Sequence, residues 1–393
     1  MSLISFDQAL EIVGRATAPM AAEMVPLDQA AGRVLRANVI ATFDSPRSDV
    51  SMMDGYAVRE ARVGEEYAVI GTLAAGARFD GSVGAGQAVR IFTGAAVPEG
   101  AGRVVIQENV AIDGDRMTIV EGSGGPSFVR ARGSDFRTGD IVVAAGTRLS
   151  PGALVAAAGA GADRVDVARR PRVATIATGD ELRTVGQLLD AEHIPDSIGP
   201  GLAAMLGAMG AEVIGHQLLG DDLTMLQAAA ADAVARADLV VVTGGASVGA
   251  RDHAKAMFAP LGMELLFSKV AIKPGKPVWL GRVGETLVMG LPGNPGSALV
   301  TARLLLAPLV AGLLGQKNPP PLQWIDLPLA TPIPATGDRE TFLRATLHNG
   351  QLHPVANQDS GAQRALGEAS FLVRCPAGQG ALPAGHTVSA IAL

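Results

Sequence analysis

The stretch ADLVVVTGGASVGARDH, residues 237–253, contains the pattern that decides the fold of this chain. Leu239–Val242 is a short, continuously apolar run rich in β-branched residues, as expected for a strand covered on both faces of its sheet. The run ends at Thr243-Gly244-Gly245, where the backbone can turn sharply and a ligand can approach without meeting a Cβ atom. A helical pattern follows. The stretch therefore predicts strand, glycine loop and helix, the repeating unit of a parallel α/β sheet.

Two downstream segments extend this unit: KVAIKPGKPVWLGR (Lys269–Arg282) and LVMGLPGNPGSALVTARLLL (Leu287–Leu306). The second predicts another strand, a Pro/Gly loop and an apolar helix. Because open α/β sheets bind ligands at the carboxyl ends of their strands, and helix starts favour anions, we expect an anionic small ligand here. The residues available to it are Gly244, Gly245, Ser247, Gly249, Lys269, Lys273, Lys276, Pro292 and Pro295. The alternative is that the glycines only make tight turns, since the Lys and Ser/Thr of a Walker A loop are missing after Gly249.

Acidic residues follow two further predicted strands, Arg172–Ala177 and Glu212–Gln217. The first strand leads into Thr178-Gly179-Asp180-Glu181, the second into Leu219-Gly220-Asp221-Asp222, and Asp252 follows the glycine loop. The carboxyl ends of parallel strands lie at the same edge of a sheet, and carboxylate oxygens are the ligands that Mg²⁺ prefers. We therefore expect a magnesium site there. For Asp221 and Asp222, ordinary N-capping of the next helix is the alternative.

The rest of the chain predicts smaller units around this domain. A capping-box spacing predicts a helix over Ser5–Ala16, an amphipathic pattern predicts a second helix over Leu27–Arg36, and a strand is expected at Val39–Phe43. Short alternating runs such as Ala88–Phe92 and Arg103–Gln107 predict an inserted β-domain. The expected units are 1–45 with 146–171 (mixed helix and strand, elongated), 46–145 (inserted β), 172–315 (α/β), 316–322 (proline-rich linker) and 323–393 (C-terminal β).

Several motifs, in order along the chain, resemble the signature segments of the molybdopterin molybdenumtransferase family, which includes bacterial MoeA and the E domain of gephyrin. They are MMDGYAV (Met52–Val58), IFTGAAVPEG (Ile91–Gly100), RARGSDF (Arg130–Phe136), ATGDEL (Ala177–Leu182), TGGASVGARDH, IKPGKP and GLPGNPGSA. The resemblance covers about residues 1–315, and the remainder matches loosely. It implies a central three-layer α/β domain with a mostly parallel sheet of the molybdopterin-binding type. An inserted β-domain, an N-terminal mixed domain and a C-terminal β-domain complete this expected fold.

The resemblance and the chemistry of the residues together suggest roles for individual positions. Catalytic roles are expected for Asp54, by resemblance, and for Glu181 and Asp252; substrate contacts for Thr93, Asp135, Thr178, Gly179, Asp221, Asp222, Gly244, Gly245, Ser247 and Gly249; molybdate contacts for Lys269, Lys273, Lys276, Pro292 and Pro295; and Mg²⁺ ligation for Glu181, Asp221 and Asp252. Asp54, Thr93 and Asp135 also suit a cap or a turn. Family members commonly have Asn and Ala where Val50 and Met52 stand, which alters the hydrogen bonding around Asp54.

The implied reaction takes adenylylated molybdopterin and molybdate and yields molybdenum cofactor and AMP, with Mg²⁺ as cofactor. The resemblance further implies a homodimer in which the domain of Asp54 faces the α/β domain of the partner, with an upstream adenylyltransferase and downstream molybdoenzymes as partners. Two alternatives stay open. One is a molybdopterin adenylyltransferase or nucleotide pyrophosphatase on the same α/β unit, and the other is a non-catalytic cofactor-binding scaffold.

Composition excludes other classes of function. The net charge is −6 and aromatic residues are 4% of the chain, so neither a nucleic acid nor an anionic membrane is an expected partner. Cys375 is the single cysteine and the histidines form no helical pair, so no disulfide and no zinc site is expected. The N-terminus has no signal-peptide pattern, which predicts a cytoplasmic protein. The apolar run Gly296–Gly315 is expected to be a buried helix because Arg303 and Pro308 interrupt it.

Overall fold

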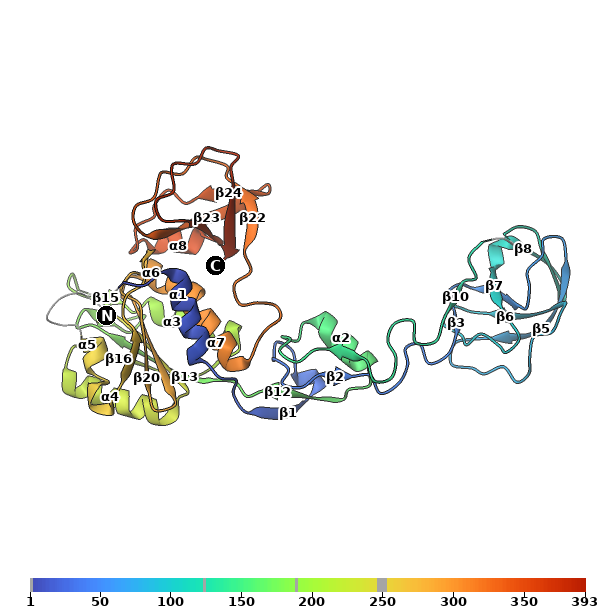
Figure 1. The fold of residues 1–393 in the computed structure, drawn as a ribbon, viewed down its shortest axis with the longest axis horizontal. Coiled ribbons are helices and arrows are strands. Elements are labelled where there is room, and N and C mark those ends of the chain that lie inside the picture. Colours follow the sequence, from blue (N-terminus) through green and yellow to red (C-terminus); the bar gives the residue numbers. More distant parts are fainter. Residues whose placement is uncertain (1–2, 123–124, 188–189, 246–252) are drawn as a thin grey trace.

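The computed structural model describes residues 3–122, 125–187, 190–245 and 253–393. It is an elongated molecule (Figure 1). A large α/β domain and a C-terminal β-domain lie together at one end, a distal β-domain lies at the other end, and a slender middle unit connects them. This architecture is the expected combination of a central α/β domain with smaller mixed and β units.

The α/β domain is built on a six-stranded sheet with the order β16-β13-β17-β21-β20-β18. Its strands are β13 (Arg172–Thr178), β16 (Glu212–Leu219), β17 (Leu239–Thr243), β18 (Glu264–Phe267), β20 (Trp279–Val283) and β21 (Thr286–Leu291). The first four strands in this order are parallel to one another, whereas β20 pairs antiparallel with both β21 and β18. The predicted parallel unit is therefore confirmed, with an antiparallel edge.

Side chains of the sheet alternate between two cores, as the period of a strand requires. Leu239 and Val241 of β17 pack in one core with α1, α3 and the long helix α6-η4-α7, while Val240 and Val242 pack in the other core with α4 and α5. Both sets are fully buried, which explains the continuously apolar run. The covering helices are α1 (Phe6–Ala16), α3 (Ile198–Met209), α4 (Leu223–Arg236), α5 (His253–Ala256), α6 (Pro295–Thr301), η4 (Ala302–Leu306, a π-helix) and α7 (Ala307–Leu314). The short elements β14 (Leu182–Arg183), β15 (Ile194–Pro195) and η3 (Ala259–Leu261) complete the domain.

Helix α1 begins at the predicted place, because Ser5 and Gln8 form the expected capping box. Its buried side chains do not belong to the separate apolar core of the middle unit that follows it in sequence, although Val34 and Ala168 of that unit reach the same cluster. Phe6 and Val13 lie in the core of the α/β domain, where α1 contacts α7 and β18. We therefore propose that the first unit begins after α1, later than the expected boundary at residue 1.

The long apolar helix from Pro295 to Leu314 has the length and composition of a membrane span, yet 78% of its most apolar window is buried inside the protein. Leu304, Leu305 and Leu309 are completely buried in the core beside the sheet. This burial confirms the expected core helix.

The middle unit consists of two small antiparallel ladders, β1 with β12 and β2 with β11, beside α2. Its elements are β1 (Ala22–Pro26), η1 (Leu27–Gln29), β2 (Val39–Ile40), β11 (Ile141–Val143), α2 (Pro151–Gly159) and β12 (Arg164–Ala168).

The predicted helix over Leu27–Arg36 is wrong. Only the single 3₁₀ turn η1 forms at its start. Val34 and Leu35 instead form isolated bridges with Arg148 and Val167. Gly32, at φ +70°, turns the chain between these two parts. Pairing with residues far along the chain thus replaces the local helical pattern. The strand expected at Val39–Phe43 is also shorter than predicted, because β2 ends at Ile40.

The distal β-domain carries a six-stranded sheet with the order β7-β4-β6-β5-β9-β8 and a small ladder of β3 with β10. Its elements are β3 (Val50–Ser51), β4 (Gly55–Val58), β5 (Glu66–Leu73), β6 (Gln87–Ile91), β7 (Arg103–Ile106), η2 (Gln107–Asn109), β8 (Val110–Asp113), β9 (Arg116–Ile119) and β10 (Val129–Arg130). The alternating runs predicted as strands are β6 and β7. The buried side chains of the sheet form two apolar cores, one on each face.

The C-terminal domain is a β-sheet with the order β19-β23-β25-β26-β22, to which β24 adds beside β23. Its elements are β19 (Ile272–Lys273), β22 (Ile325–Pro328), β23 (Glu340–His348), β24 (Gln351–Pro354), α8 (Gln363–Glu368), β25 (Phe371–Cys375) and β26 (Thr387–Ala392). Strand β19 comes from the basic segment of the α/β region, so the two domains share a sheet edge. The proline-rich linker between them is non-helical, as expected, and its Pro321 carbonyl accepts a hydrogen bond from Arg303.

Candidate functional site

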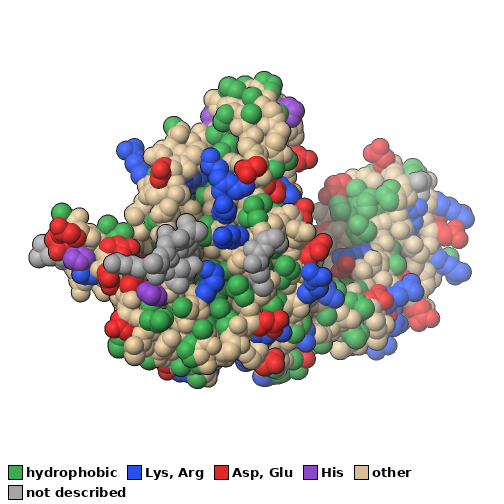
Figure 2. Space-filling view, turned by 60° about the vertical axis from the view of Figure 1, so that its left-hand side comes forward, with side chains coloured by type: hydrophobic (Ala, Val, Ile, Leu, Met, Phe, Trp, Pro, Cys, Tyr) green, Lys and Arg blue, Asp and Glu red, His purple; other side chains and the backbone are tan. Residues whose placement is uncertain are grey.

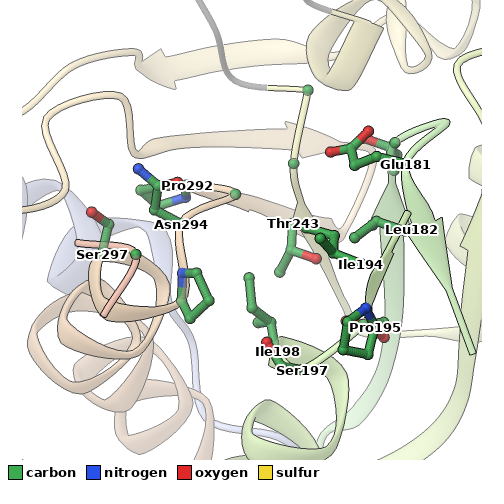
Figure 3. A pocket seen from close by; sticks show the side chains of 18 of the residues that line it. Glu181, Leu182, Ile194, Pro195, Ser197, Ile198, Thr243, Pro292, Asn294 and Ser297 are labelled. Carbon is green, nitrogen blue, oxygen red and sulfur yellow. The ribbon is translucent and has the colours of Figure 1, made fainter. Parts of the chain in front are cut away.

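A cavity of about 660 Å³ lies at the carboxyl ends of β13, β17 and β21 (Figure 3). Eight of the residues singled out from the sequence line it: Thr178, Gly179, Glu181, Asp221, Gly244, Gly245, Pro292 and Pro295. They come from strand-end loops that are far apart in sequence. The parallel sheet brings them together because its strands end at one edge.

Glycine is required in the loops at the floor of this cavity. A Cβ atom on Gly244, which has φ +86°, would lie 2.2 Å from the Thr178 carbonyl oxygen. A Cβ atom on Gly293 would lie 3.3 Å from the Gly244 Cα atom, so the loops after β17 and β21 are in direct contact. Tight turning and close approach thus both account for these glycines. The alternative reading of the loops as tight turns is compatible with their place at a cavity.

The Thr178 hydroxyl is a buried polar group without a hydrogen-bond partner among the described residues. Thr178 is 3% exposed and lines the cavity. A buried hydroxyl that makes no hydrogen bond is costly, but this oxygen is itself almost fully covered, so it does not mark a ligand position.

Acidic residues give the cavity its charge. Glu181, Asp196 and Asp221 line it, whereas no Lys or Arg does so among the described residues. Asp180 supports this arrangement from outside, since its Oδ1 accepts a hydrogen bond of 2.9 Å from the Asp221 backbone N–H. Glu181 folds back over Gly179, where a Cβ atom would lie 2.7 Å from the carboxylate. The side chains of Glu181 and Asp221 make no hydrogen bond with any residue that the structure describes, so their oxygens are available to a ligand.

No group of three or more His, Cys, Asp or Glu side chains in metal-binding proximity occurs among residues 3–122, 125–187, 190–245 and 253–393. The predicted third ligand, Asp252, lies outside the described residues, as do Ser247 and Gly249. The predicted magnesium site therefore stays a prediction, with Glu181 and Asp221 in the same cavity.

Several cavity residues were not predicted from the sequence. Asp196 comes just before α3 and also lines the cavity. Ser197 stands at the start of α3 and Asn294 at the start of α6 (Figure 3). The signal that marks them is their position just before a helix, which local capping also explains.

The C-terminal domain supplies a further wall of the cavity through Gly361 and Gln363. Arg344, which is 1% exposed, holds this wall from behind by donating hydrogen bonds to the carbonyl oxygens of Asn357, Asp359 and Ala362. Burial lowers the pKa of this guanidinium. Ser360, which follows Asp359, accepts hydrogen bonds from the Asn294 side chain and from the Gly296 backbone N–H. No local sequence pattern predicts this contribution, because it depends on how two domains dock.

The three predicted lysines lie outside this cavity. Lys269, Lys273 and Lys276 are exposed, and Figure 2 shows Lys and Arg side chains gathered on the face between the uppermost lobe and the grey segments. Lys273 belongs to β19 and lines a second cavity of about 170 Å³, whose other polar residues include Asp338, Arg339 and Thr341. The acidic cavity and the cationic one are thus separate.

Asp54 and Thr93 lie together in the distal β-domain, where Asp54 precedes β4. Asp54 Oδ1 accepts hydrogen bonds of 2.8 Å from both the backbone N–H and the hydroxyl of Thr93. These bonds, the backbone one first, hold the pKa of the Asp54 carboxyl below its ordinary value. The two residues are brought together as a pair, but within one chain they lie at the opposite end of the molecule from the cavity (Figure 1).

Asp135 and Asp222 both lie in local contacts within their own segments. Asp135 lies on the connection between the middle unit and the distal domain, with Oδ2 3.8 Å from an Arg130 guanidinium nitrogen. Asp222 is the N-cap of α4, and its Oδ1 accepts from the backbone N–H groups of Thr224 and Met225. The sequence left N-capping open as an alternative for both Asp221 and Asp222. Asp222 is the residue that caps the helix, whereas Asp221 lines the cavity.

A cavity at the strand ends of a mostly parallel sheet defines the class of open α/β proteins that bind small ligands at this edge. Three family profiles match the chain: the MoeA N-terminal region (domains I and II) over residues 4–161, a probable molybdopterin-binding domain over 174–312, and the MoeA C-terminal region (domain IV) over 326–393. The molybdopterin molybdenumtransferase of Staphylococcus aureus (strain COL) is 32% identical over 99% of this chain and 95% of its own length.

Other relatives agree with this match. The molybdopterin molybdenumtransferase of Haemophilus influenzae is 37% identical over 80% of this chain and 79% of its own length. A crystal structure of a molybdopterin biosynthesis MoeA protein from Pyrococcus horikoshii OT3 superposes with a TM-score of 0.86 at 25% identity, with both chains fully covered. The chain belongs to the molybdopterin molybdenumtransferase family.

Proposed function

We propose that this protein is a molybdopterin molybdenumtransferase, which inserts molybdate into adenylylated molybdopterin and releases AMP. The observation that carries the proposal is the cavity in which Thr178, Glu181, Asp221 and Gly244 meet, in a chain of this family. A substrate of this size and polarity suits a cavity of about 660 Å³ with several polar groups at its wall.

The charge of the cavity supports a requirement for Mg²⁺. A phosphate-linked substrate is anionic, yet Glu181, Asp196 and Asp221 face the cavity without a Lys or Arg among its described lining residues. An anion in this place needs a cation to offset the repulsion, and carboxylate oxygens are suitable ligands for Mg²⁺. Glu181 and Asp221 would hold the ion, with Asp252 as the further proposed ligand. When bound, Mg²⁺ neutralises phosphate charge.

Molybdate is proposed to enter at the second, cationic cavity. Lys273 lines it, and Arg339 stands on the same wall. A dianion gains charge-assisted hydrogen bonds from such side chains. Pro292 and Pro295 belong to the loop after β21 and line the acidic cavity, not the cationic one. Lys269 and Lys276 would act from the exposed surface, by attraction at longer range.

The position of Asp54 supports a homodimer. Within one chain, the distal domain and the cavity lie at opposite ends (Figure 1). A second copy that places its distal domain against the cavity would join Asp54 and Thr93 to Glu181 and Asp221, and would bring Asp135 towards the same substrate. Such a two-fold arrangement creates two equivalent sites. The proposed compartment is the cytoplasm.

The test is AMP release from adenylylated molybdopterin, measured with and without molybdate and Mg²⁺. We expect release only when both ions are present. Hydrolysis that does not depend on molybdate would contradict the proposal and indicate a nucleotide pyrophosphatase on the same α/β domain. Binding of the substrate without AMP release at any Mg²⁺ concentration would contradict it in favour of a cofactor-binding scaffold.

A further inference from the structure

The distal β-domain is attached to the middle unit by two chain segments, residues 43–49 on the way out and residues 130–138 on the way back (Figure 1). These segments meet in an isolated bridge between Ser45 and Phe136. The Ser45 N–H donates a 2.8 Å hydrogen bond to the Phe136 carbonyl oxygen, and the Ser45 carbonyl oxygen accepts one from the Asp135 N–H. A short two-stranded connection is only marginally stable by itself. The direction of the distal domain therefore depends on contacts beyond this bridge.

Arg132 spans the connection along its length. Its backbone N–H donates a 2.8 Å hydrogen bond to Asp49 Oδ1 at the distal end. Asp49 is held by the distal domain, because its carbonyl oxygen accepts a hydrogen bond from the Val97 N–H. The Arg132 side chain reaches back towards the middle unit, where its Nε donates a 2.6 Å hydrogen bond to Asp44 Oδ2. One residue is thus bound to the distal end through its backbone and to the middle-unit end through its guanidinium.

Asp44 is anchored on the middle-unit side. Its Oδ1 accepts hydrogen bonds of 2.9 Å from both the backbone N–H and the hydroxyl of Thr138. Thr138 lies between Phe136, which packs against the core of the middle unit, and strand β11. The Thr138 N–H, followed by Arg132 and the Thr138 hydroxyl, lowers the pKa of the Asp44 carboxyl to about 2. Asp44 is therefore ionised at neutral pH, and both of its oxygens are engaged.

The exposure of this ion pair decides what it can do. The Arg132 side chain is 66% exposed and the Asp44 side chain is 17% exposed. Exposed ion pairs contribute little to the free energy of unfolding, so the contact is not expected to keep either unit folded. A charge-assisted hydrogen bond between two units nevertheless favours one relative orientation over the others. Its effect should thus appear in the direction of the distal domain, which carries Asp54 and Thr93.

We propose that Asp44 and Arg132 are positioning residues, which form a strut that sets the direction in which the distal domain projects. By fixing this direction, the strut places Asp54 for the site that a second copy of the chain completes. Neither residue lines the cavity at the strand ends, so both act through the placement of Asp54. The inference rests on the proposed function and its homodimer for this catalytic consequence, whereas the orientation itself is a property of one chain.

The test measures the orientation directly. Spin labels are attached to Asp113→Cys, at the end of β8 in the distal domain, and to Glu285→Cys in the α/β domain, both of which are exposed positions. The native Cys375 is completely buried and is thus protected from labelling. Labelled protein is mixed with an excess of unlabelled protein, so that the distances measured by pulsed electron spin resonance lie within one chain. We expect a narrow distance distribution with the native strut and a broader one in Arg132→Met, which removes the charge but keeps an unbranched side chain.

Three further variants give the comparison its controls. Arg132→Lys keeps the charge and should restore the narrow distribution. Asp44→Asn, whose amide oxygen still accepts from Thr138, should broaden it, and Arg132→Met in that background should add nothing. Arg116→Ala is the matched control, since it removes an exposed ion pair with Glu66 inside the distal sheet, and should leave the distribution narrow. A distribution in Arg132→Met identical to that of the native strut would overturn the inference, as would equal broadening in Arg116→Ala.

A turnover measurement connects the orientation to the reaction. In steady-state AMP release, Arg132→Met should lower kcat about fivefold, the upper end for an exposed ion pair, and leave the affinity for adenylylated molybdopterin unchanged. A broadened distribution with unchanged kcat would overturn the positioning role. Weaker substrate binding with unchanged kcat would overturn it too, because Arg132 would then contact the substrate. Wild-type protein that never releases AMP would contradict the proposed function, while the distance distributions still decide whether the strut sets the orientation.

Discussion

The α/β domain and the distal β-domain hold their candidate carboxylates in different ways. Glu181 and Asp221 line a cavity and make no side-chain hydrogen bond within the described parts of the chain, so they are available to a ligand or metal ion. Asp54 does not line this cavity, yet two hydrogen bonds from Thr93 orient it and keep it ionised. The difference fits the proposal that one domain provides the binding space and the other provides a preoriented group for a site that a second chain completes.

The largest expected effect tests whether these two regions act in one site. Glu181→Ala and Asp54→Ala should each lower AMP release about a hundredfold or more, since each removes a charged group from the proposed site. Mixing the two inactive variants under conditions of subunit exchange should restore about a quarter of wild-type activity. In a two-fold dimer with shared sites, half of the mixed molecules pair unlike chains, and each such pair contains one intact site.

The control for this experiment is Glu285→Ala, an exposed carboxylate on the turn between β20 and β21. It should leave activity unchanged. If the mixture of Asp54→Ala and Glu181→Ala stays inactive although unlike chains associate, the two regions do not share a site between chains.

A second prediction separates the acidic cavity from the cationic one. Lys273→Ala should raise the KM for molybdate about tenfold or more, because a charge-assisted hydrogen bond to the anion is lost, and should leave the affinity for adenylylated molybdopterin unchanged. Lys317→Ala, an exposed lysine of the linker, is the matched control. A loss of affinity for the pterin substrate in Lys273→Ala would show that the two cavities are parts of one binding site.

A smaller effect is expected in the distal domain. Thr93→Ala removes the hydroxyl that supports the Asp54 carboxylate but keeps the bond from the backbone N–H, which is the larger cause of the lowered pKa. The pKa of Asp54 should therefore rise towards its ordinary value without reaching it. Because the native pKa is depressed, the activity that depends on ionised Asp54 is lost as the pH falls through that pKa. In Thr93→Ala this loss should begin at a higher pH. The measurement is the rate of AMP release as a function of pH on the acidic side, for the wild type and Thr93→Ala. Identical pH dependence of the two proteins would contradict the prediction.

The smallest expected effect distinguishes two adjacent aspartates. Asp222→Ala removes the N-cap of α4 and should lower the free energy of unfolding by about 1 kcal/mol with little change in AMP release. Asp221→Ala should do the reverse, since Asp221 lines the cavity. Denaturant unfolding and turnover of both variants provide the comparison. Loss of turnover in Asp222→Ala, with stability unchanged, would instead indicate that Asp222 contacts the substrate.

Local patterns predicted elements wherever the local preference and the tertiary packing agree. The capping box at Ser5 and Gln8 begins α1, and the apolar run Leu239–Val242 is a central strand buried on both faces. The pattern over Leu27–Arg36 failed because Val34 and Leu35 pair with residues more than a hundred positions away. Helical periodicity contains no information on such distant partners.

The candidate site divides in the same way. Thr178, Glu181, Asp221 and Gly244 follow directly from strands and loops, and parallel pairing alone brings them to one edge. Asp196, Ser197 and the wall formed by Gly361 and Gln363 were missed, because capping and interdomain contacts decide their positions.

The sequence by itself thus determined the parallel α/β domain, the family resemblance and the loops at its strand ends. These depend on the alternation of side chains and on glycine and carboxylate positions that neighbouring residues specify. Only the tertiary structure decided that Lys273 joins the C-terminal sheet away from the cavity, and that Asp54 lies at the far end of the molecule. Both outcomes depend on the docking of whole domains, whose surfaces are assembled from distant parts of the chain.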